Sequence, residues 1–350
     1  MLNAINAVVP RLEPHINRVG ALNRRPYDPR ISTGPPSGRW PIVHYGVMLP
    51  GIADPFRFLT NIVILGTASR IPAWNNAPLL AGEPASDSAW ILTGSAIQSD
   101  AFHRYSIERD CDLAADGSRL RFGDQLSIAG RPNGRSGAEA ETIRLAIREG
   151  DLVADLELRP TTLITHFIHL PGIYQHWGVM CEVDAALSSA ADPSVSVQHS
   201  GLATYEYARG TNLPLPILFF TYQIINVDAR TQILFTDVLG PAGFPLQRKV
   251  NVRTTDGENS TFIRGFAHEV HTRLSPQLTP TGERMKLPET FTWSVDDDDG
   301  SALITIHGHT NDDFTYGLGA GFAGSYSYTG AFRGASIEGT GYIEWCDEKV

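Results

Sequence analysis

One carboxylate, Glu206, lies in a stretch near the middle of the chain where the residue types could support proton transfer. The stretch covers residues 199–210 and places Glu206 between Tyr205 and Tyr207 in a β-like pattern. An apolar cavity disfavours the charged form of a carboxyl group, so we expect the pKa of Glu206 to be raised and the group to act as a general acid or base near neutral pH. The alternative is that Glu206 has a structural role and forms an ion pair with Arg209 or another arginine at a strand end.

Histidines occur in pairs that could in principle ligate a metal. His307 and His309 are two residues apart, so they face the same side of a strand, and Asp312 and Asp313 follow closely. Paired histidines at strand ends are more often hydrogen-bonded structural groups, and we therefore predict no metal site. The sequence has no P-loop and no G-x-S-x-G motif, and the G-x-G-x-x-G match at residues 319–324 precedes a strand rather than a helix. We expect no organic cofactor.

Composition limits the classes of protein to consider. The chain has 350 residues, 42% of them hydrophobic, with 28 basic and 38 acidic residues and no cluster of lysine and arginine. This predicts a folded globular protein that does not bind nucleic acid. Three separated cysteines without a C-x-x-C motif fit a reducing compartment, so we expect a cytoplasmic protein. No apolar run approaches the roughly 20 residues of a transmembrane helix.

The hydrophobic pattern has mostly a period of two after residue 38. Clear hairpins are predicted at residues 143–159, 218–239 and 290–308, and a series of short strands is predicted at residues 325–345. Before residue 38, a short helix at residues 2–9 and a proline-rich segment predict an arm that packs on the body. The polar, glycine-rich segment at residues 130–140 predicts a surface loop.

The predicted fold class is therefore all-β, with two tandem antiparallel barrels or sandwiches. We expect an N-terminal arm at residues 1–38, a first β domain at residues 39–198 and a second at residues 199–350. Most of the aromatic residues that follow the period of two are expected to fill the core.

Three short motifs are spread over the middle and end of the chain. They are Tyr-Gln-His-Trp-Gly at residues 174–178, the segment between the glycines of residues 201 and 210, and Gly-Thr-Gly-Tyr-Ile-Glu at residues 339–344. Each motif resembles a segment of carotenoid 1,2-hydratase-like proteins. The first resembles the His/aromatic-Trp segment that ends their first domain. The second resembles the Gly-x-x-x-x-Asp-x-x-x-Gly segment that opens their second domain, and the third resembles their closing Gly-x-Gly-Tyr-x-Glu strand. The chain thus resembles the tandem lipocalin-like superfamily, which also includes AttH-like and Diels-Alderase-like proteins.

This resemblance implies two lipocalin-like barrels packed side by side, with a hydrophobic cavity near their junction. It also implies an acidic residue that protonates an alkene so that water can capture the cation. Glu206 falls where the family has Asp, Thr204 where it often has Tyr, and Trp177 on its Trp, whereas His176 lies one position nearer the Trp than the family's His. These departures point to a substrate or reaction other than carotenoid hydration.

The function predicted from the sequence is an enzyme of the lyase (hydro-lyase) or isomerase/cyclase type. It would act without a cofactor, by hydration or dehydration, isomerisation or cyclisation, on a hydrophobic terpenoid, polyketide or lipid-like molecule, with Glu206 and His176 as catalytic residues. The residues expected to bind the substrate are Tyr174, Trp177, Thr204, Tyr205, Tyr207 and Tyr222. The sequence does not fix the oligomeric state, and a homodimer is one option. The alternatives are a non-catalytic carrier of lipids or isoprenoids and a scaffold whose barrels are both filled by side chains.

Overall fold

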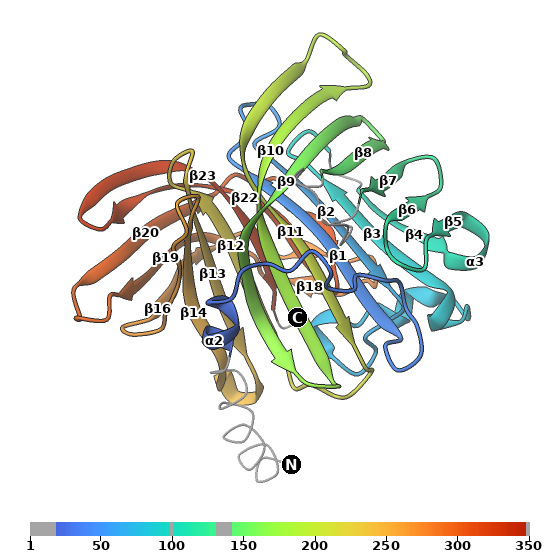
Figure 1. Ribbon diagram of the computed structural model, residues 1–350, viewed down its shortest axis with the longest axis horizontal. Coiled ribbons are helices and arrows are strands. Elements are labelled where there is room, and N and C mark those ends of the chain that lie inside the picture. The colour runs from blue at the N-terminus through green and yellow to red at the C-terminus, as the bar shows by residue number, and fades with distance from the viewer. Residues whose placement is uncertain (1–18, 99–100, 131–141, 348–350) are drawn as a thin grey trace.

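Antiparallel strands form most of the molecule, as the computed structural model shows for residues 19–98, 101–130 and 142–347 (Figure 1). The expected helix at residues 2–9, the first half of the expected arm and most of the expected loop at residues 130–140 lie outside these described residues. The helical segments are short: α2 (Val19–Asn23), η1 (Pro72–Trp74), η2 (Ala77–Leu80), η3 (Ala85–Asp87), α3 (Ile107–Asp110) and η4 (Pro241–Gly243). No helix in the described ranges is both long and apolar enough to cross a membrane.

The first sheet has 11 strands in the described part of the chain, in the order β4-β3-β2-β1-β11-β10-β9-β8-β7-β6-β5. Their bounds are β1 (Ile42–Pro50), β2 (Phe58–Leu65), β3 (Ser88–Gly94), β4 (Phe102–Ser106), β5 (Cys111–Leu113), β6 (Arg119–Phe122), β7 (Leu126–Ala129), β8 (Ile143–Glu149), β9 (Leu152–Leu170), β10 (Tyr174–Ser189) and β11 (Ser196–Gly210). Strand β1 lies between β2 and β11, so the start of the domain is paired with its end.

The second sheet has the order β15-β14-β13-β12-β23-β22-β20-β19-β16, and β21 pairs with β22. Its strands are β12 (Phe219–Asn226), β13 (Thr231–Leu239), β14 (Pro245–Thr254), β15 (Asn259–Phe262), β16 (Ala267–Arg273), β19 (Pro288–Asp296), β20 (Ala302–Thr310), β21 (Thr315–Leu318), β22 (Gly321–Phe332) and β23 (Ala335–Cys346). A separate pair consists of β17 (Gln277–Leu278) and β18 (Arg284–Met285).

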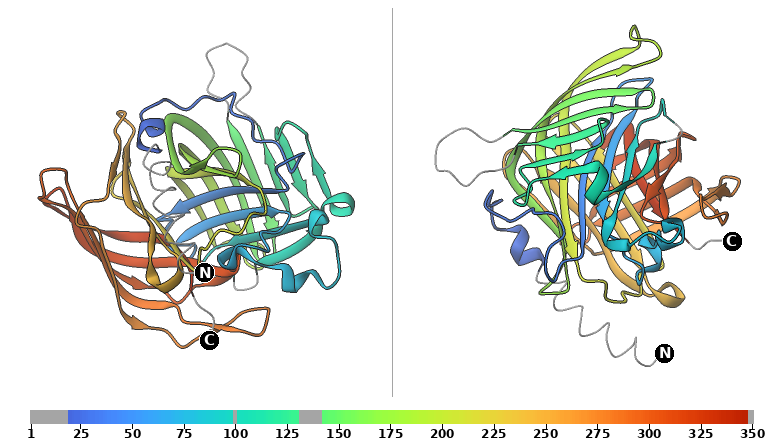
Figure 2. Two further views of the ribbon diagram at one scale, coloured as in Figure 1. Left: turned by 90° about the horizontal axis from the view of Figure 1, so that it is seen from below. Right: turned by 90° about the vertical axis from the view of Figure 1, so that its right-hand side faces the viewer.

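Both sheets are strongly curved, the first into a nearly closed barrel and the second into a half-barrel (Figure 2). The predicted fold of tandem antiparallel barrels is therefore confirmed. Each barrel has its own apolar core: Leu145, Leu156 and Val183 lie in the first, and Phe235 and Trp293 lie in the second. This is the result expected when alternate residues of each strand turn inward.

The three predicted hairpins are confirmed as the pairs β8–β9, β12–β13 and β19–β20. The series of short strands expected at residues 325–345 is wrong, because residues 321–332 and 335–346 form two long strands that pair along their whole length. The glycines in this region leave room for neighbouring side chains. At Gly341 an added Cβ would lie 2.5 Å from Cζ of Tyr326.

The chain passes from the first sheet to the second between Gly210 and Phe219. The stretch at residues 199–210, which we placed at the start of the second domain, belongs to β11 and pairs with β1 and β10 of the first sheet. The domain boundaries stay a prediction, because a change of sheet does not by itself define a unit that folds alone.

The outer faces of the two barrels pack against each other along β1, β2 and β11 on one side and β12, β13 and β23 on the other. Apolar side chains such as Met48, Phe58 and Tyr342 fill part of this junction. Polar bonds also cross it, since the fully buried Arg253 donates to the carbonyl of Gly178 at 3.2 Å. The candidate site lies in the same junction.

Candidate functional site

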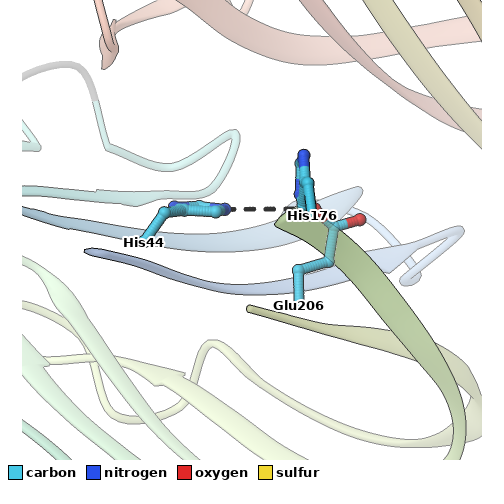
Figure 3. A group of neighbouring side chains, drawn as sticks. All are labelled: His44, His176 and Glu206. Atoms are coloured by element: carbon cyan, nitrogen blue, oxygen red, sulfur yellow. Dashed lines mark hydrogen bonds and ion pairs between the residues drawn. The ribbon is translucent and has the colours of Figure 1, made fainter. Parts of the chain in front are cut away.

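Three polar side chains from neighbouring strands of the first sheet meet at the junction: His44 from β1, Glu206 from β11 and His176 from β10 (Figure 3). Nε2 of His176 lies 3.0 Å from Oε2 of Glu206, and Nε2 of His44 lies 3.9 Å from the same oxygen. The Glu206 side chain is only 2% exposed. The carboxylate is therefore held between two imidazoles and shielded from bulk water.

The strand register explains how two imidazoles reach one carboxylate. His44 and His176 both pair with Ala208, while the two residues that pair with Glu206 are glycines, Gly46 and Gly178. An added Cβ at Gly46 would lie 3.1 Å from Nε2 of His44, and one at Gly178 would lie 3.2 Å from Cγ of Glu206. Small residues on both sides thus leave the space in which the three side chains meet.

Three of the predicted site residues lie on the other face of the sheet. We expected Trp177, Tyr205 and Tyr207 to line the cavity, but the structure places them in the core of the first barrel. Successive residues of a strand point to opposite faces, so neighbours of His176 and Glu206 must turn away from the site. In that core, Tyr207 donates from its hydroxyl to the carbonyl of Gly34 at 3.0 Å.

The other predicted residues lie on the site's side of the sheet. Tyr174 and Tyr222 line the cavity together with His176 and Glu206. Thr204 lies further along β11, where its hydroxyl donates to Oε1 of Gln232 at 3.0 Å. Thr204 therefore takes part in the bonds that join the two sheets.

The electrostatics of Glu206 differ from the expectation. Burial alone would raise the pKa of this carboxyl, but hydrogen bonds and charges from His176 and His44 outweigh it and lower the pKa to about 2. Burial lowers the pKa of His176, against the opposing effect of Glu206. The predicted raised pKa is thus wrong, because the prediction considered the burial of Glu206 and not its two histidine partners. Glu206 is a carboxylate at neutral pH and accepts a hydrogen bond from a neutral His176. The alternative partner, Arg209, instead donates to Gln175.

The ring of His44 has its protonation pattern set by the backbone. Its Nδ1 lies 3.2 Å from the carbonyl oxygen of Val63, which can only accept, so Nδ1 carries a proton. When the ring is protonated, Nε2 also carries a proton and its charge favours the Glu206 carboxylate 3.9 Å away; in the neutral ring, Nε2 is an unprotonated acceptor. This distance is too long for a hydrogen bond between the two atoms, so each can accept one from a donor such as a water or a substrate group.

A cavity opens beside these residues, between the two sheets. The space open to the centre of a water molecule is about 80 Å³, enough for a ligand or several waters. Its apolar lining is Ile42, Ile62, Ile64, Ala68, Ile71, Trp74, Phe167, Ile168, Ile217, Phe220, Val238 and Leu318. Such a cavity suits an apolar molecule with one polar or reactive group at the end next to Glu206.

Two titratable residues of the cavity, His44 and Glu344, were not predicted from the sequence. His44 precedes an aromatic residue and a glycine, as His176 does, and this repeated His-aromatic-Gly order was the available signal. Glu344 lines the cavity from β23 and is 2% exposed, and it ends the Gly-x-Gly-Tyr-x-Glu motif. The indication for Glu344 in the sequence was that this motif resembles the closing strand of the carotenoid 1,2-hydratase-like proteins.

The same three residues are the group in the described chain that could hold a metal ion, since one donor atom from each lies within 4.8 Å of the others. Two imidazoles and a carboxylate suit zinc or a similar ion. His307 and His309 are exposed, and Nδ1 of His307 lies 3.2 Å from the hydroxyl of Thr292. No third close ligand joins these two histidines within the described residues.

Solved structures share this arrangement of sheets. Kievitone hydratase from Nectria haematococca has a TM-score of 0.51 and 13% identity, covering 94% of this chain and 92% of the other. An AttH-like protein from Nitrosomonas europaea has a TM-score of 0.56 and 11% identity, covering 89% and 94%. CghA in complex with Sch210972 has a TM-score of 0.51 and 8% identity, covering 93% and 97%. Identities at this level show a shared fold.

The predicted resemblance in fold is confirmed, because the chain shares its arrangement of sheets with kievitone hydratase, the AttH-like protein and CghA. Residues 62–349 match the model of a family described as "Family of unknown function (DUF6670)", and the chain belongs to that family. No curated protein matches the chain in sequence.

Proposed function

We propose that this protein is an enzyme that transfers protons to and from a hydrophobic small molecule bound between its two barrels. The observation that carries the proposal is a buried carboxylate, Glu206, held by His176 and His44 on the wall of a largely apolar cavity. Burying a charge is costly, and a structural role would be served equally by apolar residues. The reaction types that fit are addition or removal of water, isomerisation and cyclisation.

In this proposal His44 moves the proton and Glu206 stabilises the charge that results. Nε2 of His44 accepts a proton from water or substrate, because the other ring nitrogen, Nδ1, already carries a proton and donates a hydrogen bond to the carbonyl of Val63. The imidazolium then forms an ion pair with Glu206, as a carboxylate does in a catalytic dyad. His176 holds Oε2 of Glu206 and keeps the carboxylate facing His44.

The substrate is proposed to be a terpenoid, polyketide or lipid-like compound. Trp74 and Phe220 lie on the apolar wall, with their ring centroids 6.2 Å apart. The similarity in fold to kievitone hydratase and to CghA, which is seen with a bound small molecule, supports a small-molecule substrate. A homodimer and a cytoplasmic location remain predictions from the sequence.

Native mass spectrometry and lipid extraction test the proposal, with the purified protein incubated with a panel of isoprenoid and polyene compounds. Wild type should convert at least one compound, and Glu206→Gln and His44→Gln should bind it but lower turnover by about 10²- to 10⁴-fold. Glu182→Gln on β10 and His199→Gln on β11 are matched controls, since both residues lie outside the cavity lining. Binding without turnover by wild type would favour the carrier, and no binding would refute a ligand cavity.

A further inference from the structure

The three side chains that meet at the junction have the composition of a divalent metal site. One donor atom each from His44, His176 and Glu206 lies within 4.8 Å of the other two (Figure 3). Two imidazoles and one carboxylate form a ligand set that holds zinc or iron(II) and leaves at least one coordination position open. The prediction of no metal site considered histidines close together in the sequence, whereas these ligands come from three strands, β1, β10 and β11.

The distances between the donor atoms fit a single ion. Zinc lies about 2.1 Å from an imidazole nitrogen or a carboxylate oxygen, so two of its ligand atoms are at most about 4.2 Å apart. Oε2 of Glu206 is 3.0 Å from Nε2 of His176 and 3.9 Å from Nε2 of His44. The donor atoms of the two histidines lie within 4.8 Å of each other. A closure of at most about 0.6 Å, which side-chain rotation can supply, brings this last pair into range.

The backbone prepares His44 to act as a ligand. Its Nδ1 donates to the carbonyl of Val63, which leaves the lone pair of Nε2 free on the side of Glu206. Histidines that bind metal usually have their other ring nitrogen held in this way, because the bond fixes both the tautomer and the ring orientation. In His176, Nε2 carries the proton that it donates to Glu206, so this ring binds an ion once its proton has moved to Nδ1.

The Glu206 carboxylate has a buried negative charge that a metal ion would compensate. Its Oε1 is buried and makes no hydrogen bond within the described residues. The nearby Arg253, which is also buried, donates instead to Thr204 and Gln232. The partners of Glu206 in the described ranges are thus two imidazoles and no lysine or arginine. Because a buried charge without a compensating charge is costly, a cation bound between these ligands is favoured.

The remaining coordination position of such an ion opens to the cavity, because all three ligands line it. Glu344 lines the same cavity from β23, but it is not part of the group of atoms that lie within 4.8 Å of one another. The fourth position is therefore left to a water or to an oxygen or nitrogen atom of a bound molecule, as in zinc sites that keep one position open.

We propose that His44, His176 and Glu206 bind one Zn²⁺ ion or a divalent transition-metal ion of similar size. The ion takes Nε2 of His44, the atom that accepts a proton in the proposed function. Metal binding and proton transfer by His44 therefore exclude each other, and bound zinc inhibits the enzyme. The metal site goes beyond the proposed function and does not depend on it, whereas the inhibition rests on it.

Zinc binding to protein freed of metal with a chelator tests the site without a substrate. Titration calorimetry should give one ion per chain for wild type, and His44→Gln, His176→Gln and Glu206→Gln should each lower the affinity by about 10²-fold or more. The double variant His307→Gln/His309→Gln removes an exposed histidine pair on β20 of the other sheet and should bind zinc as wild type does.

A cobalt spectrum separates a built site from ions held on the surface. Co²⁺ with four ligands absorbs visible light strongly, whereas Co²⁺ on exposed histidines keeps a shell of water and absorbs weakly. The strong band should appear in wild type and in the His307→Gln/His309→Gln variant and be absent from Glu206→Gln. The amide in Glu206→Gln has the shape of the carboxylate and can still accept from His176, so this variant should fold, and far-UV circular dichroism checks that it does. Zinc binding that the three ligand variants leave unchanged, or that the double variant loses, would be adventitious and would overturn the site.

The inhibition is measured with a compound from the panel that wild type converts. Turnover should fall in proportion to bound zinc and return when a chelator removes the ion. If zinc binds while turnover is unchanged or higher, the exclusion fails together with the role of His44 as proton acceptor, and the metal site stands. If zinc does not bind while His44→Gln and Glu206→Gln lose turnover, the metal site fails and the proposed function stands.

Discussion

Lys249 is expected to make the stability of this protein depend on pH above neutrality. It lies on β14, is 5% exposed, and donates from Nζ to the carbonyls of His166 and Phe167 at 3.2 Å each. Burial lowers the pKa of this ammonium group from 10.5 to about 7. No carboxylate is paired with it in the described part of the chain, so its charge is compensated by the two carbonyl dipoles and by the ring of Phe167, whose centroid lies 5.6 Å from Nζ.

The sign and size of the effect follow from proton linkage. An unfolded lysine keeps its proton up to about pH 10.4, whereas the folded one loses it near neutrality, so the unfolded state binds more protons between these values. The free energy of unfolding should therefore rise with pH in this window, by up to about 1.4 kcal/mol per pH unit. From about pH 7 to about pH 9 the total is up to about 2.7 kcal/mol. The two carbonyl bonds favour the charged form and reduce the rise.

Urea unfolding of wild type and Lys249→Met, measured in steps from about pH 6 to about pH 9, tests this linkage. Wild type should gain stability relative to the variant as pH rises. Lys286→Met, in which an exposed lysine is replaced, is the control. Its stability should rise with pH relative to Lys249→Met by as much as that of wild type does. Parallel curves for wild type and Lys249→Met across the range would show that Lys249 stays charged, and would refute the assigned direction of its pKa.

Three further changes probe the junction, the second barrel and the cavity. Arg253→Met should lower the free energy of unfolding by about 1–3 kcal/mol, because Gln232 loses one of its two buried donors and the hydroxyl of Thr204 loses the donor from which it accepts. Urea unfolding measures this, and a variant as stable as wild type would mean that the desolvation of the guanidinium cancels its hydrogen bonds. Gly308→Ala should cost about 1–3 kcal/mol, since its Cβ would lie 2.3 Å from Cζ of Phe291; an unchanged thermal midpoint would contradict this. Trp74→Ala should weaken binding of an apolar ligand by about tenfold or more through lost apolar contact, as titration calorimetry can show, and unaltered affinity would place the ligand elsewhere.

The hairpins could be predicted from the sequence, because a turn signal and the alternating residues beside it lie close together in the chain. The turn at Gly150, with alternating apolar residues on either side, gave the β8–β9 hairpin, and similar signals gave two more. The motifs around His176 and Glu206 predicted two members of the site because β10 and β11 are consecutive strands that pair. The long strands β22 and β23 were cut short in the prediction, because their glycines are read as turns when the large side chains that need the space are unknown.

Which face of β11 points to the site could not be read from the sequence. From Leu202 to Tyr207 every residue of this strand is buried, because one face packs in the barrel core and the other packs on the second sheet. The alternation that normally separates a core face from a solvent face is therefore absent. For this reason the sequence did not distinguish Tyr205 and Tyr207, which face the barrel core, from the residues that face the site. The low pKa of Glu206 depends on His44, which is distant in the sequence and meets it only through strand pairing.

The pairing of β1 with β11 determines when the site can form during folding. It joins residues 42–48 to residues 204–210, so β11 must be brought back to β1 across all the chain between them before His44 meets Glu206. Contacts this distant in the chain are slow to form, because a large loop must close first. A nascent chain that has not yet reached Gly210 cannot assemble the triad. Recovery of activity after denaturation should therefore follow the slow pairing of β1 with β11, rather than the earlier appearance of local hairpins.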